Sequence, residues 1–349
     1  MKTILLTLDY EIFGNGSGDV FENLVAPMHR LLEIAREEGF RYTIFFETIE
    51  FLRMKREFCG GNSMGYAENP VLAVEKQLIE AYQSGHDVQL HIHPQWAAAR
   101  WEENGWILDE NWALGSYGTD EELLDLIKEG KDYLESILRR VDSGYKCTAL
   151  RAGAYCLQPS GRIAAVMKKL GLYVDSSIVP GAVSVDKRGR YDYSSVSKHL
   201  DYWFADREME TDTPNGSILE LPLAVHPVRR IRKILSISAL MSRTGKNKSA
   251  REALNAKSGD GRKSSVADKI RYVFGVESQT WDFCILLPSI HRTFLRDAAT
   301  SAKNLFVLVG HPKGFVDERG FRFFIEATKG TYRFLTIRQF VASVSHAEV

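Results

Sequence analysis

Two acidic residues stand at the end of an apolar segment near the N-terminus, "KTILLTLDYE" (2–11). Side chains of a β-strand alternate between two faces, so Thr7, Asp9 and Glu11 share one face of the expected strand. Carboxylates are costly there unless they are paired, solvated or bound to a cation. Two interpretations stay open at this point: the strand ends and the acids face water, or they form part of a site.

Three histidines occur in the segment "GHDVQLHIHP" (85–94). The same alternation puts His91 and His93 on one face, from which two imidazoles could bind one metal ion such as zinc. A hydrogen-bonded pair of histidines without a metal is the alternative. His86 has the opposite parity, which favours a buried, hydrogen-bonded structural residue.

Two further polar residues end apolar runs later in the chain: Arg151 follows "CTAL" and His311 follows "NLFVLVG". In parallel α/β folds the carboxyl ends of the strands meet at one edge, where active sites are built. Because four such runs each end in residues suited to catalysis or metal binding, we interpret them together as a metal-dependent hydrolase site. His226 ends another apolar run, and whether it enters this site stays open.

The elements that must position these residues are strands and helices, which alternate along the chain. One helix has a clear start, because Thr119 and Glu122 have the spacing of a capping box. This alternation predicts βαβ units and a parallel sheet that is either barrel-like or doubly wound. The expected strands cover residues 2–8, 41–47, 86–93, 146–151, 172–177, 216–225 and 304–311; the expected helices cover 20–39, 69–85, 119–138 and 160–171, with a last one from about 336.

The composition is that of an ordinary globular chain of 349 residues, 44% hydrophobic and 26% charged. Lys plus Arg equals Asp plus Glu at 45 each, so no overall charge favours nucleic acid. Four scattered cysteines suggest neither disulfides nor a thiolate metal site. The first apolar run is too short for a signal peptide, and no run approaches the roughly 18 residues of a membrane span. We therefore expect a cytoplasmic protein.

One segment differs in composition from the rest of the chain. Residues 229–271 contain thirteen Lys and Arg against three acidic residues. We expect a single domain over 1–349 with this basic insertion acting as a lid. Residues 231–241 combine apolar and basic side chains, so peripheral contact with an anionic membrane is the alternative.

The motifs resemble those of the NodB-homology polysaccharide deacetylases, the fourth family of carbohydrate esterases. The similarity covers about residues 1–181 and 303–342, in the order of the family's motifs. The segments that carry it are "TLDYE" (7–11), "RYTIFFE" (41–47), "GHDVQLHIHP" (85–94), "LRAGAY" (150–155), "GLYVDSSIVPG" (171–181) and "VGHPKGF" (309–315).

This resemblance implies an irregular (β/α) barrel that removes an N-acetyl group from an amino sugar with the help of a divalent metal, most readily zinc. It implies Glu11, His91 and His93 as the metal ligands. The chain departs from the family pattern twice. Gln95 occupies the usual position of the second metal histidine, and Tyr10 that of the second aspartate.

The resemblance also implies the catalytic roles. Asp9 would take a proton from the water that attacks the acetyl carbonyl, Arg151 would keep Asp9 ionised, and His311 would protonate the departing amine. A backbone N–H near Tyr155 would bind the oxyanion. Trp96 directly follows the histidine segment, and its ring could stack on a sugar.

We expect the substrate to be a nucleotide-linked or lipid-linked amino sugar, a precursor in the biosynthesis of a surface polysaccharide. The phosphates of such a substrate would suit the basic insertion. Two other functions remain open. One is an allantoinase-like hydrolase that opens a cyclic amide without a metal, and the other is a non-catalytic relative that binds carbohydrate.

Overall fold

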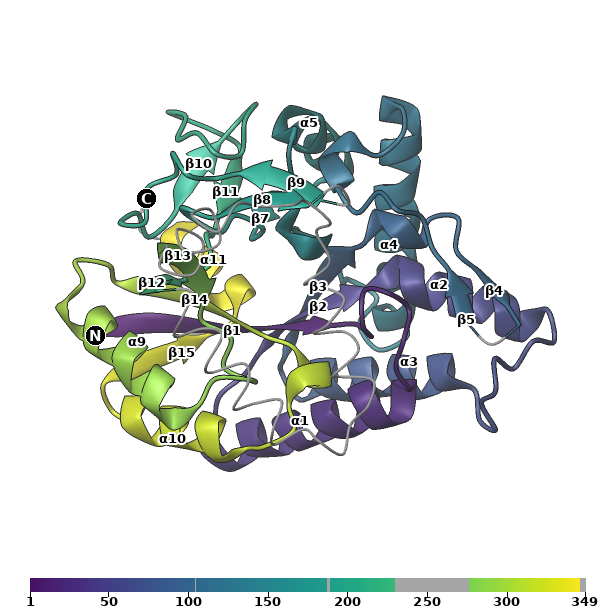
Figure 1. The fold of residues 1–349 in the computed structure, drawn as a ribbon, viewed down its shortest axis with the longest axis horizontal. Helices are drawn as coiled ribbons and strands as arrows, with labels where there is room; N and C mark the ends of the chain where they lie inside the picture. Colours follow the sequence, from purple (N-terminus) through teal and green to yellow (C-terminus); the bar gives the residue numbers. More distant parts are fainter. Residues whose placement is uncertain (104, 187–188, 230–275, 346–349) are drawn as a thin grey trace, which may run out of the picture.

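A nine-stranded sheet forms the centre of the molecule (Figure 1). The computed structural model describes residues 1–103, 105–186, 189–229 and 276–345. All neighbouring strands of the sheet run parallel except β10 and β11, and β15 pairs with β1 beside the main path. In spatial order the strands are β10 (Trp203–Ala205), β11 (Ile218–Glu220), β7 (Val174–Asp175), β6 (Ala149–Ala152), β3 (Asp87–Ile92), β2 (Thr43–Glu47), β1 (Lys2–Tyr10) and β14 (Leu305–Gly310), with β15 (Tyr332–Leu335).

The sheet curls until its two sides are linked by a short segment after β11. Leu223 N donates to Ile178 O, just beyond β7, at 2.9 Å, and Ala224 N donates to Val307 O on β14 at 2.8 Å. The molecule is therefore an α/β protein whose curled, mixed sheet forms an incomplete barrel, which confirms the expected fold class.

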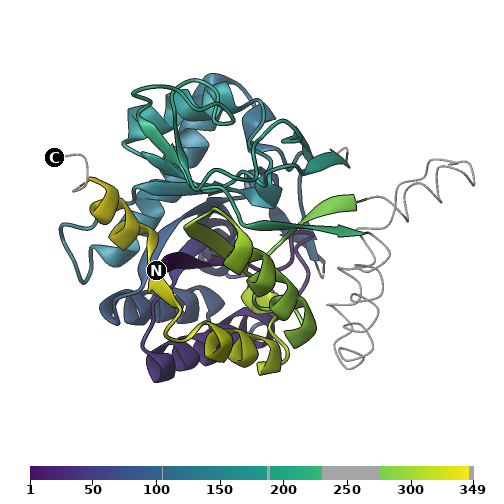
Figure 2. The same ribbon diagram turned by 90° about the vertical axis from the view of Figure 1, so that its left-hand side faces the viewer.

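Helices surround the outside of the curled sheet (Figure 2). The capping box that the sequence predicts is present, because Thr119 Oγ1 accepts from Glu122 N and Glu122 Oε2 accepts from Thr119 N. The α-helices are α1 (Ala26–Glu38), α2 (Thr48–Cys59), α3 (Pro70–Gln83), α4 (Asp120–Leu138), α5 (Ser160–Leu170), α9 (Pro288–Thr300), α10 (Arg319–Thr328) and α11 (Ile337–Ser345).

Three helices were not expected from the sequence: α2, α9 and α10. The helix α2 follows β2 without a loop, since Glu47 ends the strand and also caps the helix by accepting from Glu50 N. The single helix expected over 20–39 instead begins with a π-helical turn, Phe21–Val25, before α1. It ends as predicted at Gly39, whose φ of 76° lies in the left-handed region.

Within the described residues, three two-stranded antiparallel sheets lie outside the main sheet: β4 (Arg100–Glu102) with β5 (Gly105–Ile107), β8 (Val183–Asp186) with β9 (Gly189–Asp192), and β12 (Val225–Arg229) with β13 (Val276–Thr280). The basic insertion expected at 229–271 lies outside the described residues, apart from Arg229 at the end of β12. Within the described ranges, no helix has the length and the apolar character that crossing a bilayer requires.

Candidate metal centre and active site

The carboxyl ends of neighbouring strands bring the candidate residues together. His91 is the partner of Glu47 on β2 and of Arg151 on β6 in the parallel register of the sheet. Leu8, one residue before Asp9, pairs with Gly310, one residue before His311. Residues that are far apart in the sequence thus meet at one edge of the sheet, as the sequence predicts.

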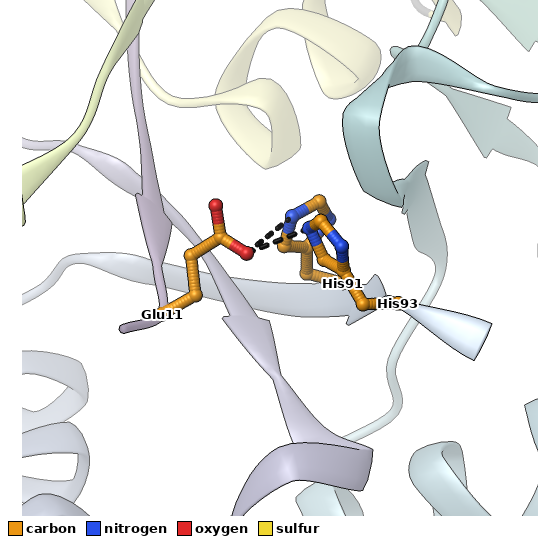
Figure 3. A group of neighbouring side chains, drawn as sticks. All are labelled: Glu11, His91 and His93. Carbon is orange, nitrogen blue, oxygen red and sulfur yellow. Dashed lines mark ion pairs between the residues drawn. The ribbon is translucent and has the colours of Figure 1, made fainter. Parts of the chain in front are cut away.

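Glu11, His91 and His93 form a buried cluster, which we call the ligand group. One potential ligand atom from each residue lies within 4.8 Å of the others. Glu11 Oε2 is 2.6 Å from His93 Nε2 and 3.6 Å from His91 Nε2. Figure 3 shows the carboxylate of Glu11, which lies just beyond β1, pointing towards both imidazoles. This geometry confirms that His91 and His93 share one face.

The donor atoms of the ligand group suit a divalent metal ion. His91 Nδ1 is 2.8 Å from the carbonyl oxygen of Arg151, which can only accept, so Nδ1 carries the proton and Nε2 keeps a lone pair. The Nε2 atom of His91 is buried without a hydrogen-bond partner among the described residues, and the Nε2 atom of His93 faces Glu11 Oε2 at 2.6 Å. Buried nitrogen atoms without a partner are costly, and two nitrogens with one carboxylate oxygen are a common zinc ligand set.

Lys313 completes the surroundings of Glu11, and the sequence analysis missed it. Lys313 Nζ donates to Glu11 Oε1 at 2.7 Å and to the carbonyl oxygen of Ile12 at 2.8 Å. Burial alone would raise the pKa of Glu11, but the charges of His93 and Lys313 hold it well below its ordinary value. Glu11 is therefore ionised, with Oε1 bonded to Lys313 and Oε2 facing the two histidines.

Asp9 and Arg151 form a buried ion pair beside the ligand group. Arg151 Nη1 donates to Asp9 Oδ1 at 2.6 Å and to Thr7 Oγ1 at 2.8 Å, while its Nε donates to Ser176 O. The guanidinium also lies over the ring of Phe45, 4.1 Å from its centroid. Burial tends to raise the pKa of Asp9, but Arg151, His91 and His311 together outweigh it and the pKa is lowered. Asp9 is thus held ionised.

His311 lies between Asp9 and a second aspartate, Asp282. His311 Nε2 is 3.5 Å from Asp9 Oδ2, and His311 Nδ1 is 2.7 Å from Asp282 Oδ2. Burial would lower the pKa of His311, but the carboxylate of Asp282, helped by Asp9, raises it above the ordinary value. We call Asp9, Arg151, His311 and Asp282 the ion-pair network. Asp282 was missed because it follows no apolar run, although it bridges to Val309 on β14.

The segment after β6 is strained and touches the ligand group. Ala154 and Tyr155 both have positive φ values, 50° and 62°, which cost non-glycine residues roughly 1–3 kcal/mol each. The carbonyl of Tyr155 is held by the hydroxyl of Tyr193, which donates to it at 2.8 Å. A Cβ added to Gly153 would lie 2.5 Å from the ring of His93. Strain held in this way is typical of functional sites.

Three other residues that the sequence singled out lie elsewhere. His86 is buried and Nδ1 accepts from Tyr42 N at 3.0 Å, which confirms its structural role; burial lowers its pKa to about 4. His226 forms an ion pair with Asp297 on α9 and not with the ligand group. Trp96 is 1% exposed. Its ring packs against Trp106, 5.1 Å between centroids, and a contact between Trp96 and substrate stays a prediction.

Two buried acids at the start of α2 support the backbone under the ligand group. Glu47 Oε1 accepts from His93 N at 2.8 Å, and Glu50 Oε1 accepts from Ile12 N at 3.2 Å. Burial raises the pKa of Glu47 to about 7 and that of Glu50 well above its ordinary value. The sequence pattern predicts a strand at Glu47 and no helix at Glu50, so only their contacts across the sheet reveal this function.

Comparisons with known proteins find likeness in structure but none in sequence. The chain matches no protein-family model and no curated protein. A protein of Mycobacterium smegmatis described as a polysaccharide deacetylase aligns with 100% of this chain and 92% of its own at 14% identity, with a TM-score of 0.48. The allantoinase Puue aligns over 99% and 90% at 11% identity, with a TM-score of 0.49.

A third structure reaches a TM-score of 0.50, the GH57-type branching enzyme of Pyrococcus horikoshii. The alignment covers 98% of this chain and 70% of the enzyme at 12% identity. At that identity the likeness concerns the fold and not the activity. The chain therefore has a curled, half-barrel α/β fold like that of the GH57-type branching enzyme.

Proposed function

We propose that this protein is a metal-dependent hydrolase that removes the acetyl group from an N-acetylated amino sugar. The observation that carries the proposal is the position of the ligand group directly beside the ion-pair network. A buried set of two imidazoles and a carboxylate lies next to an ionised aspartate and a histidine whose pKa is raised. Hydrolysis of an amide needs this combination, a base for the water and an acid for the leaving amine.

Glu11, His91 and His93 would hold the metal ion, for which we propose zinc because of the nitrogen-rich ligand set. When bound, the ion would act as a Lewis acid towards the acetyl carbonyl and would lower the pKa of a water molecule. Lys313 keeps Glu11 Oε1 engaged, so that Oε2 is the oxygen directed at the histidines.

Asp9 acts as the general base in this proposal. Arg151 binds Asp9 Oδ1, which leaves Oδ2 to accept a proton from the attacking water. Because the pKa of Asp9 is lowered, the carboxylate is ionised and available at neutral pH. Loss of that proton lets the water oxygen bond to the acetyl carbon.

His311 acts as the general acid. Asp282 binds Nδ1, so the proton for the leaving group is on Nε2, the nitrogen that faces Asp9. As the carbon–nitrogen bond breaks, Nε2 gives its proton to the amine, and acetate and the free amino sugar are released. The 3.5 Å between Nε2 and Asp9 Oδ2 places acid and base close enough to serve the same amide.

Tyr155 supports the developing oxyanion in the proposal. Its backbone has a positive φ of 62° and comes two residues after Gly153, which lies against the ring of His93. A fixed backbone N–H donor stabilises an oxyanion without reorganisation. We further propose that the amino sugar is linked to a nucleotide or a lipid, as expected for a precursor of a surface polysaccharide.

Lys313 favours one alternative, a metal-free hydrolase of cyclic amides. Its ammonium group already compensates the charge of Glu11, which a site without a metal would also need. Treatment with a chelator distinguishes the two functions. The deacetylase loses its activity when the metal is removed, whereas the cyclic-amide hydrolase keeps it and turns over ureides.

The test combines the metal content with acetate release. Wild type and His93→Ala are loaded with Zn²⁺, dialysed, and assayed on N-acetylated nucleotide sugars. We expect wild type to retain about one ion and to release acetate, and His93→Ala to lose both. A wild-type protein that retains metal but releases no acetate from any acetylated sugar would support the non-catalytic, carbohydrate-binding alternative instead.

A further inference from the structure

We infer that Gln95 sets the tautomer of His93, and that its side-chain amide must turn over for His93 to become a metal ligand. Gln95 is thus a positioning residue that acts through His93. The inference rests on the proposed metal site and adds to it the means by which this chain prepares its second histidine.

The two histidines of the ligand group are held in different ways. His91 Nδ1 faces a backbone carbonyl at 2.8 Å, which accepts only, so its proton is on Nδ1 whether or not a metal is bound. His93 Nδ1 faces Gln95 Nε2 at 2.9 Å. An amide has a donating and an accepting end, so it allows either tautomer of His93.

In the structure the donating end of Gln95 faces the ring. With an N–H donor on Nδ1, a neutral His93 carries its proton on Nε2, the nitrogen 2.6 Å from Glu11 Oε2. That contact suits a site without a metal. It also blocks metal binding, because Nε2 then has no free lone pair.

Neither orientation of the Gln95 amide satisfies all of its polar atoms. Gln95 is 0% exposed, and its Oε1 has no hydrogen-bond partner among the residues that the structure describes. Its Nε2 makes one further contact, a long one of 3.4 Å to Gly14 O. Turning the amide over would bring Oε1 to His93 Nδ1, but it would give up the contact with Gly14 O and move the Nε2 donors to the position where Oε1 has no partner, so binding of the metal must offset this cost.

The turned orientation prepares His93 as a ligand. Oε1 then accepts a hydrogen bond from Nδ1–H, the lone pair of Nε2 becomes free, and Glu11 Oε2 no longer accepts a hydrogen bond from Nε2. Hydrogen bonds of this kind to the second nitrogen of a metal-bound histidine commonly change metal affinity by 10 to 100 fold. Metal binding and the orientation of Gln95 are therefore coupled.

The tautomers are read directly by ¹⁵N NMR of the histidine side chains in the whole protein at one fixed pH. In metal-free wild type we expect His91 with its proton on Nδ1 and His93 with its proton on Nε2. Saturation with Zn²⁺ should move the His93 proton to Nδ1 and leave His91 unchanged. A proton already on Nδ1 of His93 in the metal-free protein would overturn the inference.

Two variants test the coupling by Zn²⁺ affinity, measured by competition with a chromophoric chelator. Gln95→Met keeps the size but removes both amide ends, and we expect a loss of about 10 to 100 fold. Gln89→Met is the matched control. Gln89 lies on β3 and is buried as Gln95 is, but its side chain bonds to Asp87 and to the backbone of Thr148 and Ala149. Its substitution should leave the Zn²⁺ affinity unchanged.

The outcomes separate this inference from the proposed function. If wild type binds no Zn²⁺, the metal site itself is wrong. If wild type binds Zn²⁺ and Gln95→Met binds it equally well, the metal site stands and the role of Gln95 is wrong. The tautomer measurement needs only wild type, so it decides the question even if a variant fails to fold.

Discussion

The ligand group and the ion-pair network lie side by side, yet they are built differently. In the network every charged group faces an opposite charge: Arg151 binds Asp9, and Asp282 binds His311. In the ligand group the Nε2 atom of His91 has no hydrogen-bond partner within the described part of the chain, and the Nε2 atom of His93 faces the carboxylate of Glu11. The network is complete with protein atoms alone, whereas the ligand group is not.

This difference indicates what each part does. A buried, fully paired network fixes protonation states, because opposite charges hold Asp9 ionised and raise the pKa of His311. A buried group with an unpartnered nitrogen is costly unless something binds there. We therefore expect substitutions in the network to change the reaction and substitutions at the ligand group to change metal binding. The following substitutions test whether the two groups have these separate roles.

The largest effect is expected from Asp9→Asn. It removes the base but keeps the shape of the side chain, so the rate of acetate release should fall by about 10² to 10⁴ fold. The metal content should stay at the wild-type level, because Asp9 belongs to the network. Loss of the metal in Asp9→Asn would mean that Asp9 is the ligand and that Glu11 is the base.

Gly153→Ala should act on the ligand group alone. The added Cβ would lie 2.5 Å from the ring of His93 and push it from its position, and a displacement of this kind can cost about 10² fold in rate. We expect weaker Zn²⁺ binding, measured by chelator competition, and lower activity that excess Zn²⁺ partly restores. Gly105→Ala is the control, since a Cβ there meets nothing within 4 Å. Equal effects in both variants would contradict this explanation.

Asp282→Asn should have the smallest effect, confined to alkaline pH. The acid must be protonated to act, and the carboxylate of Asp282 counters the effect of burial and raises the pKa of His311. Without that charge the pKa falls, so activity should be lost at a lower pH than in wild type. At a pH low enough for His311 to be protonated in both proteins, the activities should be similar.

The readout for Asp282→Asn is the pH profile of kcat/KM. Asparagine can still accept the hydrogen bond from Cys284 N, which keeps the local backbone in place. The acid side of the profile depends on Asp9 and should not move. An unchanged alkaline side would show that His311 is not the acid, and an equal loss at every pH would indicate a structural effect.

Much of the fold was predictable from local patterns. The alternation in residues 2–11 and 86–93 placed Asp9 with Glu11, and His91 with His93, and the structure confirms both faces. The capping box at Thr119 was also correct because it depends on residues three apart. The helix α2 was missed, since it follows β2 without the loop that usually marks a boundary.

The partners of the candidate residues were much harder to predict. Asp282 and Lys313 complete the site by contacting His311 and Glu11, but neither contact has a signal in the sequence. Gln95 was noticed only as a departure from a family pattern. Gln95 lies in the 3-10 turn Pro94–Trp96, and within that turn its side chain contacts His93, two residues earlier.

The sequence by itself determined which residue types stand at the strand ends and which face of a strand they share, because both follow from a period of two residues. Only the tertiary structure decided which strands are neighbours, and therefore which charges meet. Parallel strands are joined over long stretches of chain, so their order is set by the packing of the whole sheet. That order places Arg151 on Asp9 and Gln95 on His93, and with them the protonation states on which the proposed chemistry depends.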